Sequence, residues 1–232
     1  MTAAKNPSRP AFEDRYHAGR LLAELVHHLR DQEPVVLALP RGGVPLGYEV
    51  AKSLNAPLDL LLVRKLFAPG HPTLSLGDVG EGGAMKLDEA AVREHHVPMG
   101  ELDQIVLHER EELERQAWKY YRGRPRLAVR DRVVLLVDDG VATGETIRFA
   151  LEQVRKERPA KVYVAVGVVS PGAYPELFRS TDGVFTPVVP STFHSIAEWY
   201  GKFPLVEEGE IERLLQEVHH LHDQDALPAR PA

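Results

Sequence analysis

The chain has 232 residues, of which 44% are hydrophobic and 27% charged, as is typical of a globular protein. It has no cysteine, which excludes disulfides, thiolate metal sites and cysteine nucleophiles, and no apolar run approaches the roughly twenty residues of a membrane span. The formal net charge of −6 disfavours bulk electrostatic binding of nucleic acid, so an anionic ligand must be bound locally, by backbone amides and a few cations.

The first half of the chain alternates between strand and helix patterns. Residues 1–10 contain two prolines and are expected to form a flexible arm. Residues 67–86 contain five glycines and two prolines, and a connection of this kind is expected to be a mobile loop. Apolar periodicity and β-branched runs predict the other elements: a helix over 12–29, a strand over 35–39, a helix over 44–54 and a strand over 58–63.

The second half continues the alternation, which predicts an α/β fold with a central parallel sheet flanked by helices. Residues 11–220 are expected to form one domain, and residues 221–232 a flexible tail. The predicted elements are a helix over 101–121, a strand over 133–137, a helix over 146–157, strands over 161–169 and 184–189, and a helix over 211–219.

Two carboxylates, Asp138 and Asp139, follow a buried strand and precede a predicted helix. In an open α/β sheet, ligands bind beyond the carboxyl ends of the strands, and a helix start favours phosphate. Gly144 permits close backbone approach, while Thr143 and Thr146 offer hydroxyl donors. The acids suit sugar hydroxyls or a hard cation, so the segment predicts a sugar-phosphate site. A simple helix cap would explain Thr143 alone but not the whole pattern.

This segment resembles the phosphoribosyl-pyrophosphate motif of the type I phosphoribosyltransferases. The resemblance implies a phosphoribosyltransferase-like fold with a small hood, formed here by about residues 184–215. It also assigns Asp138 and Asp139 to the ribose, as the catalytic acids and as indirect contacts of Mg²⁺ bound to phosphoribosyl pyrophosphate. Gly140 departs from the family, which usually has an aliphatic residue there. The residues assigned to the 5′-phosphate are Ala142, Thr143, Gly144, Glu145 and Thr146.

Two further strand ends carry cations. Arg41 can bind a diphosphate in bidentate fashion, and Gly42 and Gly43 can present their amides to an anion. Their position matches the pyrophosphate loop of the same family, although a tight turn with a surface arginine would look alike. Arg64 and Lys65 precede the glycine-rich segment and suit an anionic ligand, although a solvated basic pair is the simpler explanation. In the family, a cationic strand end precedes a loop that closes over the active site.

The resemblance implies transfer of the 5-phosphoribosyl group from phosphoribosyl pyrophosphate to a nitrogen nucleophile such as a nucleobase, with release of pyrophosphate. It further implies Mg²⁺ as cofactor and a homodimer, and we expect a cytoplasmic protein without nucleic-acid or membrane partners. Two alternatives remain open. One is a regulatory module that senses phosphoribosyl pyrophosphate or a nucleotide with the same pocket, and the other is a different sugar-phosphate reaction.

The acceptor is constrained by Ala142. Hypoxanthine-guanine phosphoribosyltransferases carry an aspartate at this place, near N7 of the purine, and alanine is not a proton acceptor. The loop instead resembles that of adenine phosphoribosyltransferases, so adenine is a candidate and hypoxanthine and guanine are expected to be poor acceptors. Asp78 and Glu81 are alternative general bases, although solvated loop carboxylates are the commoner explanation. Phe193, Trp199 or Tyr200 could stack on a planar acceptor, although hydrophobic packing is favoured for each of these aromatics taken singly.

Overall fold

Five parallel strands form the central sheet of the computed structural model, which describes residues 10–123 and 125–225. Each neighbouring pair is parallel, which confirms the predicted fold class. In spatial order the strands are β2 (Leu58–Leu60), β1 (Val35–Ala38), β6 (Val133–Val141), β7 (Lys161–Val169) and β8 (Gly183–Phe185).

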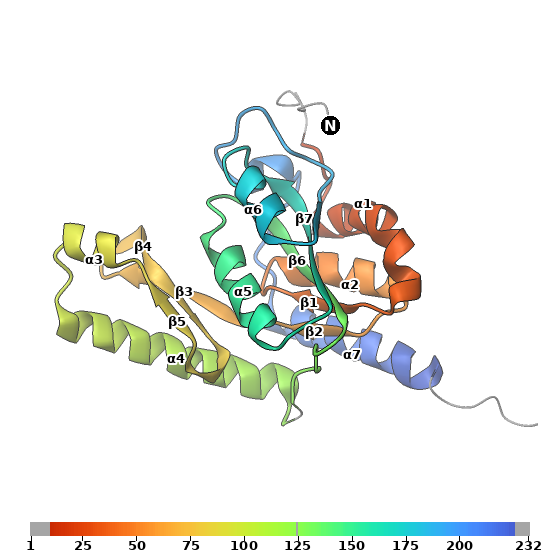
Figure 1. Cartoon of the computed structure of the whole chain (residues 1–232), viewed down its shortest axis with the longest axis horizontal. Coiled ribbons are helices and arrows are strands. Elements are labelled where there is room, and N and C mark those ends of the chain that lie inside the picture. The colour runs from red at the N-terminus through yellow and green to blue at the C-terminus, as the bar shows by residue number, and fades with distance from the viewer. Residues whose placement is uncertain (1–9, 124, 226–232) are drawn as a thin grey trace, which may run out of the picture.

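Helices cover both faces of this sheet (Figure 1). Successive side chains of β1 point to opposite faces of the sheet and are all apolar, so both faces must be buried. Val36 and Ala38 belong to one buried cluster, and Val35 and Leu37 belong to the other. The first cluster includes residues of α1 (Arg15–Val26), α2 (Gly43–Leu54) and α7 (Glu208–Asp225), and the second includes residues of α5 (Glu145–Lys156) and α6 (Tyr174–Ser180).

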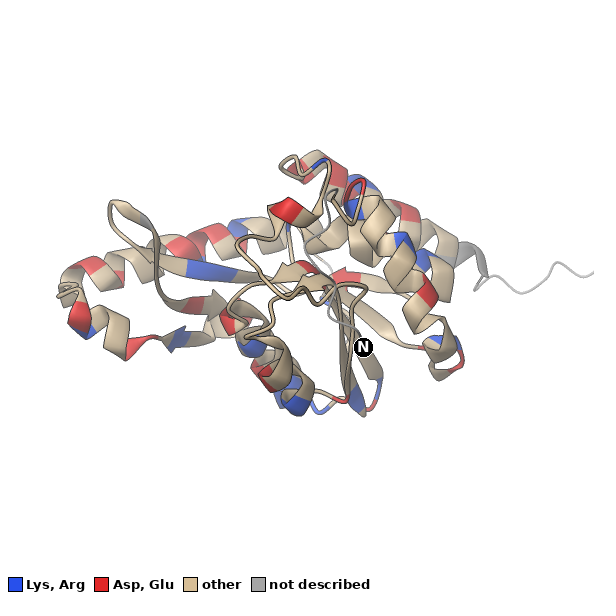
Figure 2. Ribbon diagram, turned by 90° about the horizontal axis from the view of Figure 1, so that it is seen from above, with Lys and Arg blue, Asp and Glu red and all other residues tan. Residues whose placement is uncertain are grey.

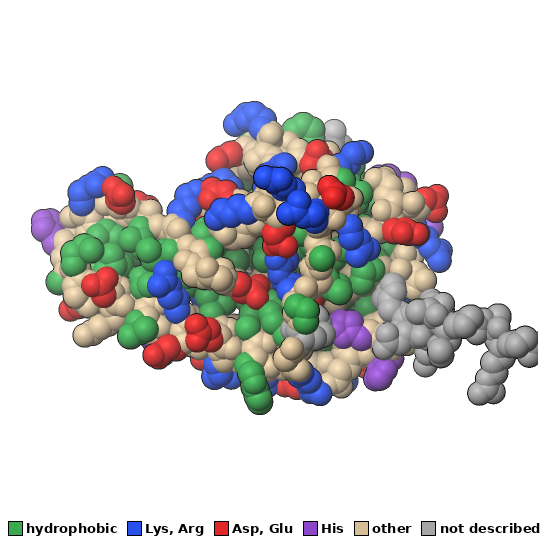
Figure 3. All heavy atoms as spheres, turned by 60° about the horizontal axis from the view of Figure 1, so that its bottom comes forward, with side chains coloured by type: hydrophobic (Ala, Val, Ile, Leu, Met, Phe, Trp, Pro, Cys, Tyr) green, Lys and Arg blue, Asp and Glu red, His purple; other side chains and the backbone are tan. Residues whose placement is uncertain are grey.

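Residues 63–121, which follow β2 and precede β6 in the chain, form a side lobe that projects from the core (Figures 1 and 2). Three antiparallel strands pack beside the long helix α4. On the face shown in Figure 3, hydrophobic side chains gather over the lobe, whereas acidic and basic ones are interspersed over the core. The lobe contains β3 (Val63–Ala68), β4 (His71–Gly80), β5 (Met85–Leu87), α3 (Glu89–Glu94) and α4 (Met99–Tyr121).

The segment 67–86, expected as an irregular loop, is mostly β-strand. Leu76 and Val79 are buried, and they supply the apolar face that the glycine content obscures. Gly77 is required by the strand pairing, because a Cβ there would lie 2.1 Å from the carbonyl oxygen of Lys86. Gly82 and Gly83, both with positive φ, form the turn before β5. The predicted mobility of this segment stays a prediction.

Some other helices and strands begin or end at residues different from those predicted. Helix α1 begins at Arg15 because the Asp14 side chain accepts a hydrogen bond from the His17 amide at 2.8 Å. The strand expected over 58–63 ends at Leu60, and the next strand belongs to the side lobe. Parts of the predicted arm and tail, 1–9 and 226–232, lie outside the described residues. Within the part described, no helix is long and apolar enough to cross a bilayer.

The segment 186–207, between β8 and α7, packs against the start of the described chain. The Phe12 amide donates to the Trp199 carbonyl at 2.9 Å, and the Gly201 amide donates to the Phe12 carbonyl at 2.8 Å. We call residues 186–207 the C-terminal cover; they are the middle part of the predicted hood. This pairing fixes the C-terminal cover on the core beside the residues considered next.

Candidate active site

The acid pair lies near the carboxyl end of β6 and lines a cavity of about 200 Å³. Asp139 is buried and Asp138 is partly exposed. The two acids, Lys65 and the predicted phosphate loop all line this one cavity. Its lining residues are Lys65, Ile196 and all positions from Asp138 to Ile147.

The loop 140–144 and the first turn of α5 have the geometry of an anion site. Gly144 has φ +83°, a left-handed conformation that favours glycine, and α5 begins at the next residue. The first amides of a helix have no intrahelical acceptors and point toward a ligand at its start. The Thr146 hydroxyl, predicted to face a phosphate, instead donates to the buried Asp78 of β4 at 3.0 Å.

The glycines after β1 pack directly against the end of β6. A Cβ on Gly42 would lie 2.0 Å from Oδ2 of Asp139, and one on Gly43 would lie 2.5 Å from the Val137 carbonyl oxygen. Both positions therefore require glycine for close approach. The Arg41 side chain turns away from the acid cavity, which it does not line, and its guanidinium lies 3.3 Å from the Glu208 carboxylate of α7.

Arg64 and Lys65 separate because successive side chains of a strand point to opposite faces. Lys65 lines the acid cavity and pairs with Glu145 at 3.1 Å. Arg64 pairs instead with Glu109 and Glu112 of α4, and it is absent from the cavity wall. The prediction grouped the two cations, but the geometry supports a ligand-binding role for Lys65 alone.

Arg15, which sequence reasoning missed, pairs with the acid pair from α1. Its Nε donates to Asp139 Oδ2 at 2.8 Å, and the residue is 9% exposed. Its Nη1 donates to the Pro204 carbonyl at 2.6 Å, and the guanidinium lies 3.7 Å from the centroid of the Phe203 ring. Arg15 thus joins the second acid to the C-terminal cover.

The electrostatics of the acid pair follow from burial and from the adjacent Arg15 guanidinium. Burial raises the pKa of Asp138 well above its ordinary value, and the adjacent Asp139 raises it further. Burial also raises the pKa of Asp139, against the opposing effect of Arg15. The pair therefore favours a proton, hydroxyl donors or a cation at Asp138, the member without a direct salt bridge.

The aromatic residues predicted as a stacking surface are mainly packing residues. Trp199 and Tyr200 are buried, and the Tyr200 hydroxyl donates to the backbone carbonyl of Asp139 at 2.6 Å. Phe193 is partly buried against the same cluster. The C-terminal cover instead contributes Ile196 to the cavity.

Ile196 explains the unusual glycine in the loop. A Cβ on Gly140 would lie 2.8 Å from Cγ2 of Ile196. The isoleucine therefore occupies the space that a side chain at position 140 would need, and the two residues form one wall of the cavity.

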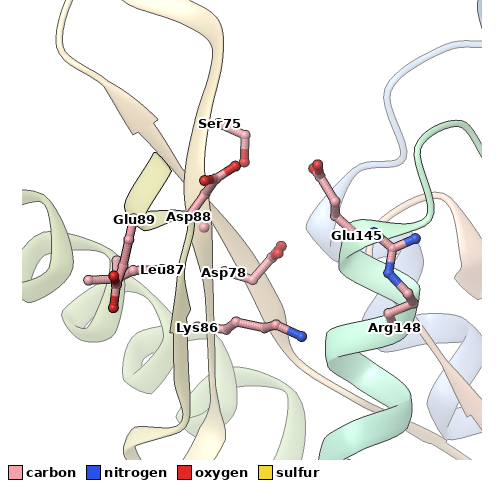
Figure 4. Close-up of a pocket in the computed structure, with 9 residues that line it drawn as sticks. Ser75, Asp78, Lys86, Leu87, Asp88, Glu89, Glu145 and Arg148 are labelled. Atoms are coloured by element: carbon pink, nitrogen blue, oxygen red, sulfur yellow. The ribbon is translucent and has the colours of Figure 1, made fainter. Parts of the chain in front are cut away.

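A second cleft lies beside the first, between the side lobe and α5 (Figure 4). Asp78 and Lys86 extend into it from the lobe, opposite Glu145 and Arg148 of α5. Glu145 lines both cavities. Glu81 lies elsewhere: its carboxylate accepts hydrogen bonds from the Leu62 amide and the Tyr121 hydroxyl. Neither Asp78 nor Glu81 lines the acid cavity, so the geometry does not support either as its general base.

A family model of the phosphoribosyl transferase domain matches residues 11–181. This stretch contains the acid pair, Lys65, the loop with Gly42 and Gly43, and the loop 140–144. The chain belongs to the phosphoribosyl transferase domain family. The match ends just after α6, so the C-terminal cover and α7 lie outside it.

Individual relatives agree with this assignment to the phosphoribosyl transferase family. The Mycobacterium tuberculosis protein named "Putative phosphoribosyl transferase Rv0571c" is 38% identical over 208 residues, 90% of this chain and 47% of that protein. The chain thus spans about half the length of the curated relatives it matches. The crystal structure of TT1426 from Thermus thermophilus is 43% identical, with a TM-score of 0.72, covering 89% of this chain and 98% of that one.

Proposed function

We propose that the chain transfers the 5-phosphoribosyl group of phosphoribosyl pyrophosphate to a nitrogen atom of a nucleobase-like acceptor and releases pyrophosphate. One observation carries the proposal. An acid pair, a helix N-terminus behind a left-handed glycine, and a lysine line one cavity in a phosphoribosyl transferase domain. The acid pair complements the ribose of the substrate, and the helix N-terminus and the lysine complement its anionic groups.

The acid pair suits the ribose. Asp138 can accept hydrogen bonds from ribose hydroxyls, while Asp139 stays paired with Arg15. Positive charge develops at the anomeric carbon as pyrophosphate departs, and a carboxylate already oriented by its surroundings stabilises that charge without reorganisation. Ribose hydroxyls and developing positive charge both favour the ionised form of Asp138, and so oppose the effect of burial, which raises its pKa.

The two ends of the substrate are anions, and different loops suit them. The first amides of α5 and the Thr143 hydroxyl would bind the 5′-phosphate. The loop after β1 would bind the pyrophosphate through Arg41 and the Gly42 amide, because the Gly43 amide, predicted as a second donor, already donates to the Leu39 carbonyl at 3.0 Å. Fixing both ends holds the anomeric carbon beside the acid pair, so positioning supplies much of the rate.

Mg²⁺ fits this site as a partner of the substrate. The described residues contain no cluster of three or more metal-ligating side chains, and Mg²⁺ is commonly held by one or two carboxylates together with substrate phosphates. Asp138 would be the protein carboxylate nearest to such an ion, because Asp139 is engaged by Arg15. When bound, Mg²⁺ would neutralise charge on the leaving pyrophosphate.

A mobile segment is proposed to exclude water from this site. The segment 67–86 borders α5 through the Thr146–Asp78 hydrogen bond and the Lys86–Glu152 ion pair. Exclusion of water protects an oxocarbenium-like centre from hydrolysis. Hydrogen exchange in 67–86 should slow when phosphoribosyl pyrophosphate, Mg²⁺ and an acceptor analogue are added, and equal exchange in both states would contradict the proposal.

The central experiment measures pyrophosphate release from phosphoribosyl pyrophosphate and Mg²⁺ with a panel of bases. We expect release with at least one base, and its loss in Asp138→Asn but not in Asp103→Asn, which changes an exposed acid of α4. Tight binding without turnover on any base would favour a sensing module instead. Release that persists in Asp138→Asn would remove the acid pair from the mechanism.

A homodimer is part of the same proposal, because type I phosphoribosyltransferases commonly dimerise. Sedimentation of the full chain at micromolar concentration should give about twice the 25.9 kDa mass of one chain. A monomer at these concentrations would contradict it.

A further inference from the structure

The Glu208 carboxylate, in the first turn of α7, pairs with three cations from two other parts of the chain. It lies 3.3 Å from Arg41, in the loop after β1, and 2.9 Å from Arg115 and 2.5 Å from Lys119, both in α4. The two α4 cations lower the pKa of Glu208 to about 2, so it is ionised near neutral pH. One anion therefore faces three converging cations.

A buried hydroxyl beside these cations is unsatisfied. Tyr120 is 5% exposed, and its oxygen has no hydrogen-bond partner among the described residues. Tyr120 directly follows Lys119 in α4, and burial raises the pKa of its hydroxyl. Burying a hydroxyl without a partner is costly, so a bound ligand or a water molecule would stabilise it.

The neighbouring Glu212 shows what a purely structural contact between α4 and α7 looks like. It pairs with Lys119 at 3.6 Å and with Arg122 at 2.6 Å, and it joins the two helices without touching Arg41. Glu208 differs because it also reaches the loop after β1. Among the described residues, it is the one carboxylate within ion-pair distance of Arg41.

Arg41 connects these cations to the acid pair. The next residue, Gly42, packs against the Asp139 carboxylate, so the loop that carries Arg41 also contacts the acid pair. The Arg41 side chain is a third exposed and has a single ion pair at 3.3 Å, a weak restraint for a guanidinium that can bind a diphosphate through two donors.

We propose that Glu208 occupies an anion site formed by Arg41, Arg115 and Lys119, and that the pyrophosphate group of the substrate displaces it. The inference rests on the proposed function and extends it, because it assigns pyrophosphate contacts to α4 and a competing carboxylate to α7. A diphosphate brings more negative charge than a single carboxylate and more acceptor oxygens, so it can pair with all three cations at once.

The test is calorimetry of magnesium pyrophosphate binding to the full chain. Glu208→Gln removes the competing charge and keeps the side chain's size, and we expect pyrophosphate to bind about tenfold more tightly. Glu217→Gln is the matched control, because it lies on the same helix but pairs with Arg213 rather than with a cation of the proposed site, and it should bind within twofold of the unchanged chain. Equal or weaker binding by Glu208→Gln would overturn the proposal.

A second set of variants tests the cations directly. In the Glu208→Gln background, Lys119→Met and Arg115→Met should each weaken pyrophosphate binding about tenfold or more, whereas Arg122→Met, which removes a partner of Glu212, should not. Thermal unfolding of every variant separates loss of binding from loss of folding. Glu208→Asp is a second variant, which keeps the negative charge on a side chain one carbon shorter.

The two proposals fail in different ways. If Arg41→Met weakens pyrophosphate binding but Glu208→Gln leaves it unchanged, displacement of Glu208 is wrong and the proposed transfer stands. If no variant binds pyrophosphate or phosphoribosyl pyrophosphate, both proposals are wrong.

Discussion

The Arg15 guanidinium lies 2.8 Å from the Asp139 carboxylate, so the second acid of the pair carries a buried positive partner and the first does not. This asymmetry separates two adjacent carboxylates of the same type. It holds Asp139 beside the loop after β1, whereas Asp138 lines the cavity without an ion pair to another described residue. The following predictions begin from this difference.

Replacing Arg15 by methionine should shift the pH dependence of substrate binding. Arg15 lowers the pKa of Asp139, so its removal lets that pKa rise and leaves less of the pair ionised at neutral pH. Affinity for magnesium phosphoribosyl pyrophosphate at pH 7 should fall about tenfold and recover at higher pH. Calorimetry across pH 6–9 measures this, with Arg20→Met, an exposed arginine of α1, as control. An unchanged pH profile would show that Arg15 has only a packing role.

Asp138→Asn should abolish transfer and stabilise the fold. The folded-state pKa of Asp138 lies above the unfolded value of roughly 3.9, so the folded protein holds the extra proton between the two values. The free energy of unfolding therefore falls as pH rises through that window, and asparagine removes this loss. Scanning calorimetry at pH 8 should show a Tm higher by about 2–4 °C. A lower Tm, with Asp103→Asn unchanged, would contradict the assigned burial cost.

Gly144 should not tolerate a side chain. Its φ of +83° disfavours other residues, and a Cβ would lie 2.9 Å from Nη1 of Arg148. Gly144→Ala should cost about 1 kcal/mol of stability, and Gly144→Val should also weaken phosphoribosyl-pyrophosphate binding at least about tenfold, by blocking approach to the first amides of α5. The matched control is Gly172→Ala, where nothing lies within 4 Å of an added Cβ. Unaltered affinity in Gly144→Val would place the 5′-phosphate elsewhere.

Hypoxanthine and guanine should be poor acceptors. Ala142 offers no side-chain proton acceptor, and Asp78 and Glu81 lie outside the acid cavity. Steady-state kinetics across the purine bases test this, with adenine as the candidate for measurable turnover. Guanine turnover at a typical enzyme rate of ~10 s⁻¹ would contradict the argument from Ala142.

Sequence patterning predicted the parts of the site that are local in the chain. The acid pair, the left-handed glycine and the helix start all lie within nine residues, so strand, turn and helix signals suffice to place them. The sheet order could not be read in this way. The side lobe was also hidden, because its strands contain glycines that read as a loop when their partner strands are unknown.

Arg15 and Ile196 were missed because they act across long separations in the chain. Arg15 had one usable signal: it continues the buried stripe of Ala18, Gly19 and Leu22, where an arginine needs a buried partner. Ile196 had none, since it lies in an irregular segment more than fifty residues after the loop it covers. The separation of Arg64 from Lys65 was readable from strand alternation, once that segment was taken as a strand.

The fit of Ile196 against Gly140 also bears on how this enzyme family can be re-engineered. Grafting a relative's loop, with an aliphatic residue at position 140, would force a branched side chain into space that Ile196 already fills, because a Cβ alone would be 2.8 Å from that residue. Loop exchange and cover exchange must therefore be made together. A library that varies positions 140 and 196 as a pair should yield folded variants with a reshaped acid cavity that single-site libraries would discard.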